Sequence, residues 1–332
     1  MNMKIRHSNI AIFIPHNGCK NTCSFCNQKT ISGQSIQPSV SDIKNILSKA
    51  AADQKDNLQN TEIAFFGGSF TALEPDYMLM LLNTAFEYIK NYGFKGIRIS
   101  TRPDAIDENI LDILKQKGVT SVELGAQSMI DRVLSANNRG HSAQDIINAS
   151  LLIKKHRFEL GLQMMTGLYK SSPDDDYKTA QKLIFLSPDT MRIYPTTVLK
   201  GTALEELFKS GEYKPQTLEL TVTLCAKILE LCTKNNINVI KLGLHASDDI
   251  KNNMAAGVYH EAFRELVESE IFFNKALKLI AQSSSRTIQV APQNLSKMAG
   301  HKKSNLHKFE ELGINVKIIP NEGLSGHEVT LI

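Results

Sequence analysis

The sequence predicts an α/β protein built on a parallel sheet, either an open, partial (β/α) barrel or a doubly wound sheet. Short β-rich runs alternate with longer stretches that carry apolar residues at helical spacing. Several of the longer stretches begin with a residue that caps helices. Alternation of this kind gives parallel strands joined by right-handed crossovers. With 332 residues, the chain can bury a large core without disulfides or a structural metal.

Six strand and helix units follow one another from the start of the chain. Strands are predicted at 9–15, 62–66, 96–101, 121–124, 160–164 and 191–194. Helices are predicted at 41–52, 75–91, 108–117, 143–155 and 174–186, with caps expected at Ser41-Asp42, Asp107, Ser142 and Ser172-Pro173. A long helix at 217–233 and a strand near 239–244 complete this part.

The pattern changes at the polar stretch 247–253, where we place a domain boundary. The first domain is expected to span residues 1–246, and residues 247–332 are expected to form a small α+β extension. The extension is predicted to contain helices at 262–280 and 306–312 and strands at 287–291, 316–319 and 328–332.

Charge and hydropathy constrain the partners only weakly. The chain has 38 Lys and Arg and 34 Asp and Glu, and its net charge of +4 permits a nucleic-acid partner without requiring one. No apolar run approaches the ~18 residues that span a membrane, and the start lacks the pattern of a signal peptide. We therefore expect a cytoplasmic protein with no membrane contact.

Three of the five cysteines, Cys19, Cys23 and Cys26, fall within eight residues directly after the first strand, which indicates metal ligation rather than a disulfide framework. Three thiolates suit iron or zinc. A structural zinc site needs a fourth ligand, for which His16 is the near candidate, whereas three thiolates on a 4Fe-4S cluster leave one iron open. Cys225 and Cys232 lie in an apolar helix and are expected to pack in the core.

The string Gly18-Cys-Lys-Asn-Thr-Cys-Ser-Phe-Cys26 resembles the cysteine motif of the radical S-adenosylmethionine (SAM) superfamily. The resemblance implies that the three cysteines hold a 4Fe-4S cluster whose free iron binds the amino and carboxylate groups of SAM. It also implies reductive cleavage of SAM to a 5′-deoxyadenosyl radical that abstracts a hydrogen atom. Phe25 is either a packing aromatic or, by the resemblance, a neighbour of the adenine.

The second strand ends in Phe65-Phe66-Gly67-Gly68-Ser69-Phe70-Thr71. A Gly-Gly turn alone is weak evidence, although it lets backbone pass close to a ligand. In the superfamily a glycine motif at this strand end holds the SAM amino group, so the resemblance assigns Gly67, Gly68 and Ser69 to the SAM site.

Later strand ends resemble one branch of the superfamily, which holds the catalytic subunit of Elongator and oxygen-independent coproporphyrinogen III oxidase. The strings that carry this resemblance begin at Ile99, Glu123, Asn138, Gln163, Tyr194 and Gly211. They imply a partial (β/α)6 TIM-like barrel in which Ser100, Arg102, Gln127, Arg139 and Gln163 complete the SAM cradle. Gln127 and Arg139 match positions that contact the methionine part of SAM, but Arg139 is alternatively a solvated loop charge.

Three departures argue against the oxidase reaction. Ser100 stands where both relatives carry a glutamate, Gln163 where the oxidase has an aspartate, and Tyr169 replaces a proline. The last segment shows no glycine-rich pyrophosphate loop like that of the Elongator acetyltransferase domain. Its basic stretch 300–303, with His307 and Lys308, is either a phosphate-binding surface or a solvated helix start.

The resemblance implies a radical SAM enzyme that acts on tRNA and receives electrons from a reductase or a flavodoxin- or ferredoxin-type donor. A tetrapyrrole enzyme or haem-trafficking protein is the first alternative, and a non-catalytic RNA-binding scaffold with a structural cluster is the second. No residue is assigned to chemistry on the substrate, and Tyr259, His260 and Glu261 are expected either to line a pocket or to cap a helix.

Overall fold

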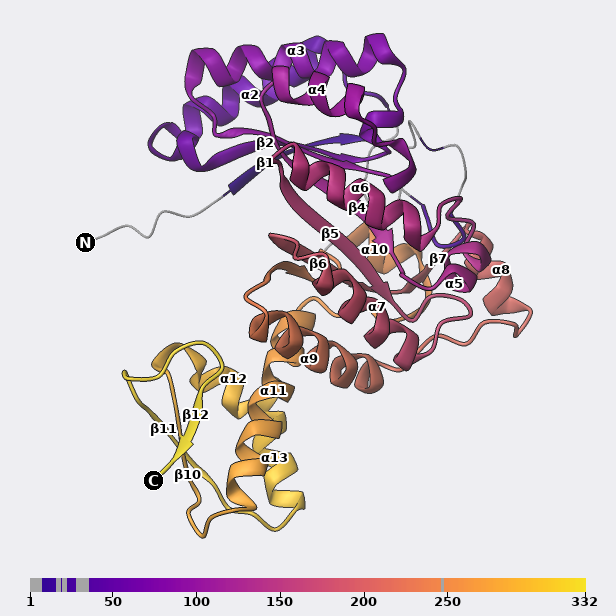
Figure 1. Ribbon diagram of the computed structural model, residues 1–332. Coiled ribbons are helices and arrows are strands. Elements are labelled where there is room, and N and C mark those ends of the chain that lie inside the picture. Colours follow the sequence, from indigo (N-terminus) through magenta and orange to yellow (C-terminus); the bar gives the residue numbers. More distant parts are fainter. Residues whose placement is uncertain (1–7, 16–18, 20–22, 28–35, 246–247) are drawn as a thin grey trace.

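The centre of the protein is a seven-stranded parallel sheet, seen in a computed structural model that describes residues 8–15, 19, 23–27, 36–245 and 248–332 (Figure 1). Its strands are β1 (Ser8–Ile14), β2 (Thr61–Gly67), β3 (Gly96–Thr101), β4 (Val119–Gln127), β5 (Glu159–Thr166), β6 (Thr190–Pro195) and β8 (Asn238–Leu242). The strand order β1-β2-β3-β4-β5-β6-β8 follows the chain in one direction. A doubly wound sheet reverses direction at a switch point, so the structure is the partial barrel, with six strand and helix units followed by a seventh strand.

Helices cover the outer face of the sheet and bury an apolar core against it. They are α2 (Val40–Asp53), α3 (Pro75–Tyr92), α4 (Glu108–Gln116), α5 (Asp131–Ala136), α6 (Ala143–Lys155), α7 (Pro173–Phe185) and α9 (Leu218–Lys234). Helix α8 (Ala203–Lys209) packs in a separate, small apolar cluster through Leu204. Cys225 and Cys232 on α9 are fully buried in this core, as predicted, and burial raises the pKa of each thiol to about 12.

Three of the four expected helix caps are confirmed, and one is corrected. Asp107, Ser142 and Ser172 each accept a hydrogen bond from the backbone N–H three residues on. Helix α2 is capped by Ser39 rather than Ser41: the Ser39 hydroxyl accepts from the N–H of Asp42 at 3.3 Å, and the Asp42 carboxylate accepts from the N–H of Ser39 at 2.9 Å. The capping box therefore begins two residues earlier, with Asp42 as its third helical residue.

The last part of the chain forms a second, three-stranded sheet. The elements of this part of the chain are α10 (Asp248–Asn253), β9 (Met254–Gly257), α11 (Phe263–Ile280), β10 (Thr287–Val290), α12 (Leu295–Ala299), α13 (Ser304–Glu311), β11 (Lys317–Pro320) and β12 (Val329–Leu331). Strand β10 lies between β11, which is parallel to it, and β12, which is antiparallel. The lower part of Figure 1 shows this sheet beside α11.

Two connections join this part to the barrel. The first half of α11 packs in the barrel core through Phe263 and Val267, and its second half packs in a separate core with Phe309. Strand β7 (Thr197–Leu199) pairs with β9 in a two-stranded sheet that the sequence did not predict. Residues 246 and 247, where we placed the domain boundary, lie outside the described residues, and the division stays a prediction.

None of the helices in the described ranges is both long enough and apolar enough to cross a membrane.

Candidate functional site

The predicted site residues gather at one edge of the sheet, where the first four strands end. The cysteine segment follows β1, Gly67 and Gly68 end β2, Arg102 follows β3, and Gln127 ends β4. The carboxyl ends of parallel strands meet at the same edge, which is where parallel barrels place their active sites.

The turn after β2 requires glycine because two backbones touch there. Gly67 has a φ of +108°, and a Cβ at this position would lie 2.8 Å from the carbonyl oxygen of Ile14. The N–H of Gly68 donates to that same carbonyl at 2.7 Å. The end of β2 is thereby held against the end of β1, directly before the cysteine segment.

Ser69 and Arg102 are committed to contacts within the protein. The Ser69 hydroxyl accepts from the N–H of Arg102 at 3.1 Å and lies 3.0 Å from the hydroxyl of Thr101. The Arg102 guanidinium donates twice to Asp104, at 2.8 and 2.9 Å. Burial alone would raise the pKa of Asp104, but these bonds lower it. Both residues therefore hold the ends of β2 and β3 in place.

Arg139 connects the cysteine segment with β4. Its Nη1 donates to Sγ of Cys23 at 2.9 Å, and its Nη2 donates to the carbonyl oxygen of Gly125 at 2.5 Å. The residue is only 7% exposed, so the alternative that it is a solvated loop charge is wrong. Its Nε is buried and has no hydrogen-bond partner in the part of the chain that the structure describes.

Gln127 lies beside Arg139 in a strained backbone conformation. Its φ of +64° is rare for a side chain of this size, and the pairing of β4 with β5 shifts register between Gly125 and Gln127. Its Oε1 is buried and, among the described residues, accepts no hydrogen bond. Both side chains approach Gly125, where a Cβ would lie 3.2 Å from Nε2 of Gln127 and 3.4 Å from Nη2 of Arg139. A buried acceptor and a buried donor without partners among the described residues suit a polar ligand that carries both an amino and a carboxylate group.

The cysteine segment is fastened to the loop that carries Arg139. Ser24 donates from its hydroxyl to Oδ1 of Asn137 at 2.7 Å and from its N–H to the Asn137 carbonyl at 3.2 Å. Asn137 is fully buried and also donates to the carbonyl of Tyr169 at 2.9 Å. No local pattern marks Asn137 in the sequence, because its partners lie far away along the chain.

The three predicted cluster ligands differ in exposure: Cys23 is buried, Cys26 is half-buried and Cys19 is exposed. Within the described residues, no three His, Cys, Asp or Glu side chains are grouped as a metal site would need. The pKa of Cys19 is raised because its thiol is partly desolvated and lies near Cys23, although Arg102 and Arg139 act in the opposite direction. Two cations therefore lie beside the thiols.

Three other predicted site residues are positioned by contacts other than the hydrogen bonds of Arg139. Phe25 is half-buried and packs against a small apolar cluster of Val198, Leu204 and Tyr213. The Ser100 hydroxyl lies 3.5 Å from Oε2 of Glu123, at the outer limit of a hydrogen bond. Gln163 is half-buried on β5, in register with Gly125.

Sequence reasoning missed a set of charged side chains on the concave face of the sheet. Arg98 donates to Glu62 at 2.8 Å, to Glu123 at 3.1 Å and to Glu159 at 2.6 Å. Arg192 donates twice to Glu123, at 2.8 and 3.1 Å. The signal in the sequence was a single charged residue in each of several consecutive strands whose other residues are uncharged. Such charges must pair when they are buried.

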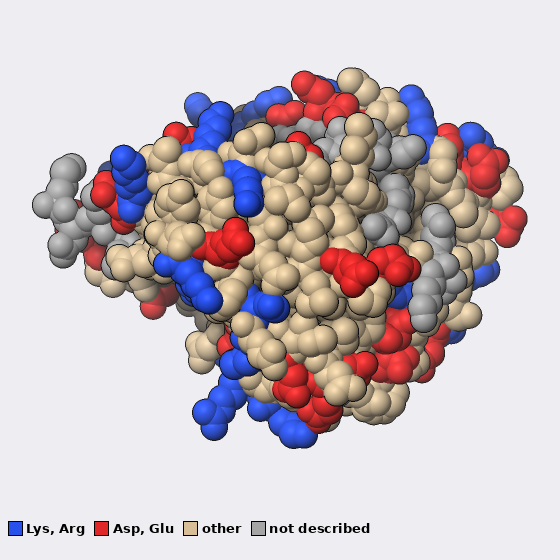
Figure 2. Space-filling model, turned by 90° about the horizontal axis from the view of Figure 1, so that it is seen from above, with Lys and Arg blue, Asp and Glu red and all other residues tan. Residues whose placement is uncertain are grey.

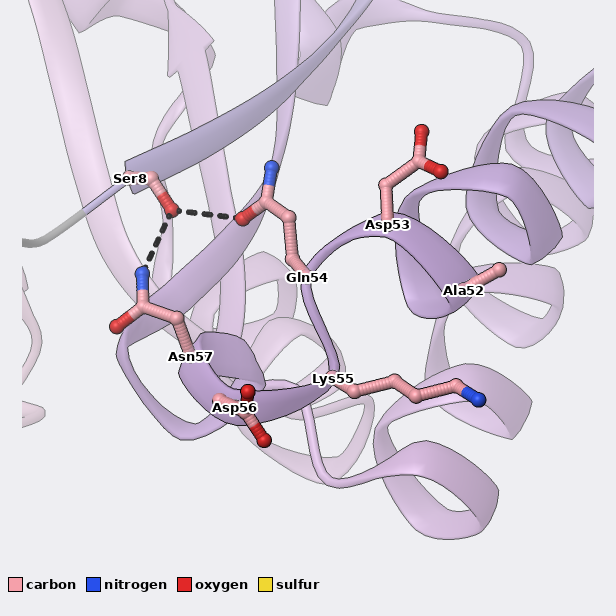
Figure 3. A pocket seen from close by; sticks show the side chains of 7 residues that line it. All are labelled: Ser8, Ala52, Asp53, Gln54, Lys55, Asp56 and Asn57. Atoms are coloured by element: carbon pink, nitrogen blue, oxygen red, sulfur yellow. Dashed lines mark hydrogen bonds between the residues drawn. The ribbon is translucent and has the colours of Figure 1, made fainter.

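A surface hollow lies at the opposite edge of the sheet, where β1 begins (Figure 3). Seven residues line it: Ser8, Ala52, Asp53, Gln54, Lys55, Asp56 and Asn57. Ser8 donates to Gln54 at 3.1 Å and accepts from Asn57 at 3.4 Å. These bonds fasten the end of α2 to β1, at the far end of the strands from the predicted site residues.

Comparison with known proteins agrees with this geometry. The model of the radical SAM superfamily matches residues 13–183, and that of the radical SAM C-terminal domain matches residues 188–272. The tRNA uridine(34) acetyltransferase of Methanocaldococcus infernus is 32% identical over 175 residues, which are 46% of this chain and 33% of that protein. Elongator complex protein 3 of Dictyostelium discoideum is 31% identical over 196 residues, or 53% and 35% of the two chains.

The chain thus matches about a third of the length of these relatives. Among solved structures, the archaeal Elp3 of Methanocaldococcus infernus has a TM-score of 0.62 at 23% identity, covering 80% of this chain and 62% of that one, which supports the fold. The superfamily model covers more than half of the chain. The chain therefore belongs to the radical SAM superfamily, whose enzymes use a 4Fe-4S cluster and S-adenosylmethionine.

Proposed function

We propose that this chain is a radical SAM enzyme in which Cys19, Cys23 and Cys26 hold a 4Fe-4S cluster and that its substrate is tRNA. The observation that carries the first part is the position of Arg139, whose guanidinium joins Cys23 to Gly125. Nearby, Oε1 of Gln127 is buried and has no partner within the described part of the chain. Held by the three cysteine thiolates, a reduced cluster would supply the electron for cleavage of the sulfonium C–S bond of SAM.

The residues around Arg139 fit the methionine part of SAM. The guanidinium, whose Nε has no partner among the residues that the structure describes, suits the carboxylate of SAM. The Oε1 of Gln127 suits its amino group, which needs acceptors. Gly67 keeps the end of β2 free of a Cβ that would lie against the carbonyl of Ile14 and push β1 and β2 apart. These side chains bind and orient the cofactor, and their burial keeps water away from it.

The proposal of tRNA as substrate rests on the relatives. The similar proteins include one named for acetylation of tRNA uridine 34 and the Elongator complex protein 3. This chain matches only about a third of their length. The proposal therefore covers tRNA as the substrate and does not include the chemical change made to its nucleoside.

A single incubation separates the candidate functions. Protein reconstituted anaerobically with iron and sulfide is mixed with SAM, dithionite, unfractionated tRNA and coproporphyrinogen III. The RNA retained by the protein is measured, and the nucleosides and tetrapyrroles are then analysed by mass spectrometry. We expect 5′-deoxyadenosine together with a nucleoside whose mass has changed. Formation of 5′-deoxyadenosine with a modified tetrapyrrole but no altered nucleoside would replace tRNA as the substrate, and RNA binding without 5′-deoxyadenosine would indicate a scaffold.

A further inference from the structure

Lys241 is a half-buried ammonium group on the concave face of the barrel, near the carboxyl end of β8. Its neighbour across the strand pair is Arg192 of β6. Met191 and Ile193, on either side of Arg192, are buried in the core beneath the helices, so Arg192 faces the concave side. Leu242 is likewise in the core, which directs Lys241 to the same side as Arg192.

The other charges of this face are already paired. Arg98 and Arg192 are bonded to the carboxylates of Glu62, Glu123 and Glu159, and Lys95 lies 3.8 Å from Glu62. Three cations thus face three carboxylates. In the described part of the chain Lys241 makes neither a hydrogen bond nor an ion pair. It is therefore a positive charge on this face that has no carboxylate partner there.

The surroundings of Lys241 are positively charged and partly shielded from water. Arg192 lies beside it on β6, with its guanidinium 5.1 Å from the ring centre of Phe66 on β2. Arg264, on α11, donates at 2.8 Å to the carbonyl of Val239 on the outermost strand and lies near Lys241. Desolvation and these two neighbouring cations lower the pKa of Lys241. A cation held in this way gains most from a bound anion.

The register of the sheet places Lys241 close to the proposed cofactor site. Gly125, Gln163, Arg192 and Lys241 form one row across β4, β5, β6 and β8. Neighbouring strands are about 4.8 Å apart, so Lys241 stands about 10 Å from Gln163 along this row. Arg192 stands between them, so the two cations continue the row from the proposed cofactor site to the last strand of the sheet.

We infer that Lys241, with Arg192 beside it, binds a phosphate of the nucleic-acid substrate inside the concave face of the barrel. This inference rests on the proposed tRNA substrate and names the residue that anchors it. The surface seen in Figure 2 carries Lys and Arg side chains scattered among Asp and Glu, without one continuous basic area. The cation at Lys241 would therefore fix the position of a bound nucleic acid, which the scattered charges of the surface in Figure 2 would not do.

The test compares three variants in binding to a short RNA stem-loop, measured by fluorescence anisotropy at several salt concentrations. Lys241→Gln should weaken binding about tenfold and reduce the slope of log K against log salt by about 0.7 to 0.9. Lys241→Arg should keep most of the affinity because it retains the charge. Lys44→Gln is the matched control, since Lys44 lies on the outer helix α2 and is 3.8 Å from Glu87.

The outcomes distinguish the role of Lys241 from the proposal that tRNA is the substrate. Wild-type affinity and salt slope in Lys241→Gln, with RNA bound by the wild type, would overturn the assignment of Lys241 and leave tRNA as the substrate. Absence of RNA binding by the wild type would overturn both. In a second measurement, acylation of Lys241 by an amine reagent should fall when the stem-loop is present, and protection by a carboxylate-bearing tetrapyrrole in its place would overturn the nucleic-acid assignment.

Discussion

Arg139 donates a hydrogen bond to Sγ of Cys23 at 2.9 Å, although the two residues are 116 positions apart in the chain. The same guanidinium donates to the carbonyl of Gly125. This arginine therefore links the segment after β1 with the end of β4. Its burial makes it part of the framework of the site.

Arg139→Ala should weaken SAM binding at least ~10-fold, because a charge-assisted pair with a carboxylate is lost. Arg139→Lys should recover only part of the affinity, since a point charge cannot keep both the Cys23 and Gly125 contacts. Anaerobic calorimetry measures the three affinities. Equal values in all three proteins would remove Arg139 from the SAM site.

Replacing Cys19, Cys23 or Cys26 with Ala should abolish the brown colour and the iron content of the reconstituted protein. Replacing Cys225 or Cys232 should leave the iron content unchanged, because both thiols are fully buried among apolar side chains on α9. Iron and sulfide analysis decides the matter, and loss of iron in either α9 variant would contradict the separation of the two cysteine groups.

Gly67→Ala should impair both folding and SAM binding, because the new Cβ would lie 2.8 Å from a backbone carbonyl and the φ of +108° disfavours Ala. We expect a loss of about 1 to 3 kcal/mol in the free energy of unfolding. Gly93→Ala is the matched control: its φ is also positive, at +78°, but nothing lies within 4 Å of its Cβ. It should cost less and leave SAM binding intact, whereas equal effects of the two variants would argue against the contact with Ile14.

Arg98→Met should lower the free energy of unfolding by about 3 to 5 kcal/mol, because it leaves the buried Glu62 carboxylate without its closest cation and removes one of the two arginines bonded to Glu123. Arg132→Met removes the pair with Asp175, in which the Arg132 side chain is 57% exposed, and should cost under about 1 kcal/mol. Denaturant unfolding compares the two. A small effect at Arg98 would mean that the carboxylates find other partners.

His141 should make folding stability depend on pH between about 4 and 6.5. Burial, followed by the nearby charge of Arg139, lowers the pKa of His141 from its usual 6.5 to about 4. Because the unfolded chain binds the proton more tightly, this contribution to stability is present above pH 6.5 and is lost as the pH falls toward 4. His141→Gln should reduce the slope of stability against pH in this window, as thermal unfolding can measure, and an unchanged slope would contradict the shift.

Much of the barrel follows from local sequence patterns. The strand at 96–101 and the helix at 143–155 have the same bounds in the prediction and in the structure. The capping residue of α2 was misplaced because Ser39 and Ser41 both precede Asp42 closely, and only the backbone geometry distinguishes them. The pairing of β7 with β9 was missed because each strand is short and its partner is distant.

The sequence predicts at which strand ends the site residues lie, but it does not predict which of these residues contact one another. The glycine turn and the cysteine spacing are visible in the sequence, whereas the bonds of Arg139 and Asn137 to the cysteine segment depend on tertiary structure. The charges of Glu62, Arg98 and Arg192 were not interpreted because each stands alone within its own strand. Only the sheet register joins them into one network.

The most direct test of the central claim is the amount of 5′-deoxyadenosine formed from SAM after anaerobic reduction with dithionite. The account predicts product from the wild-type protein and from Cys225→Ala, and none from Cys23→Ala, whose thiol accepts the hydrogen bond of Arg139. Absence of 5′-deoxyadenosine from fully reconstituted, reduced wild-type protein with tRNA present, or equal product from Cys23→Ala, would contradict it.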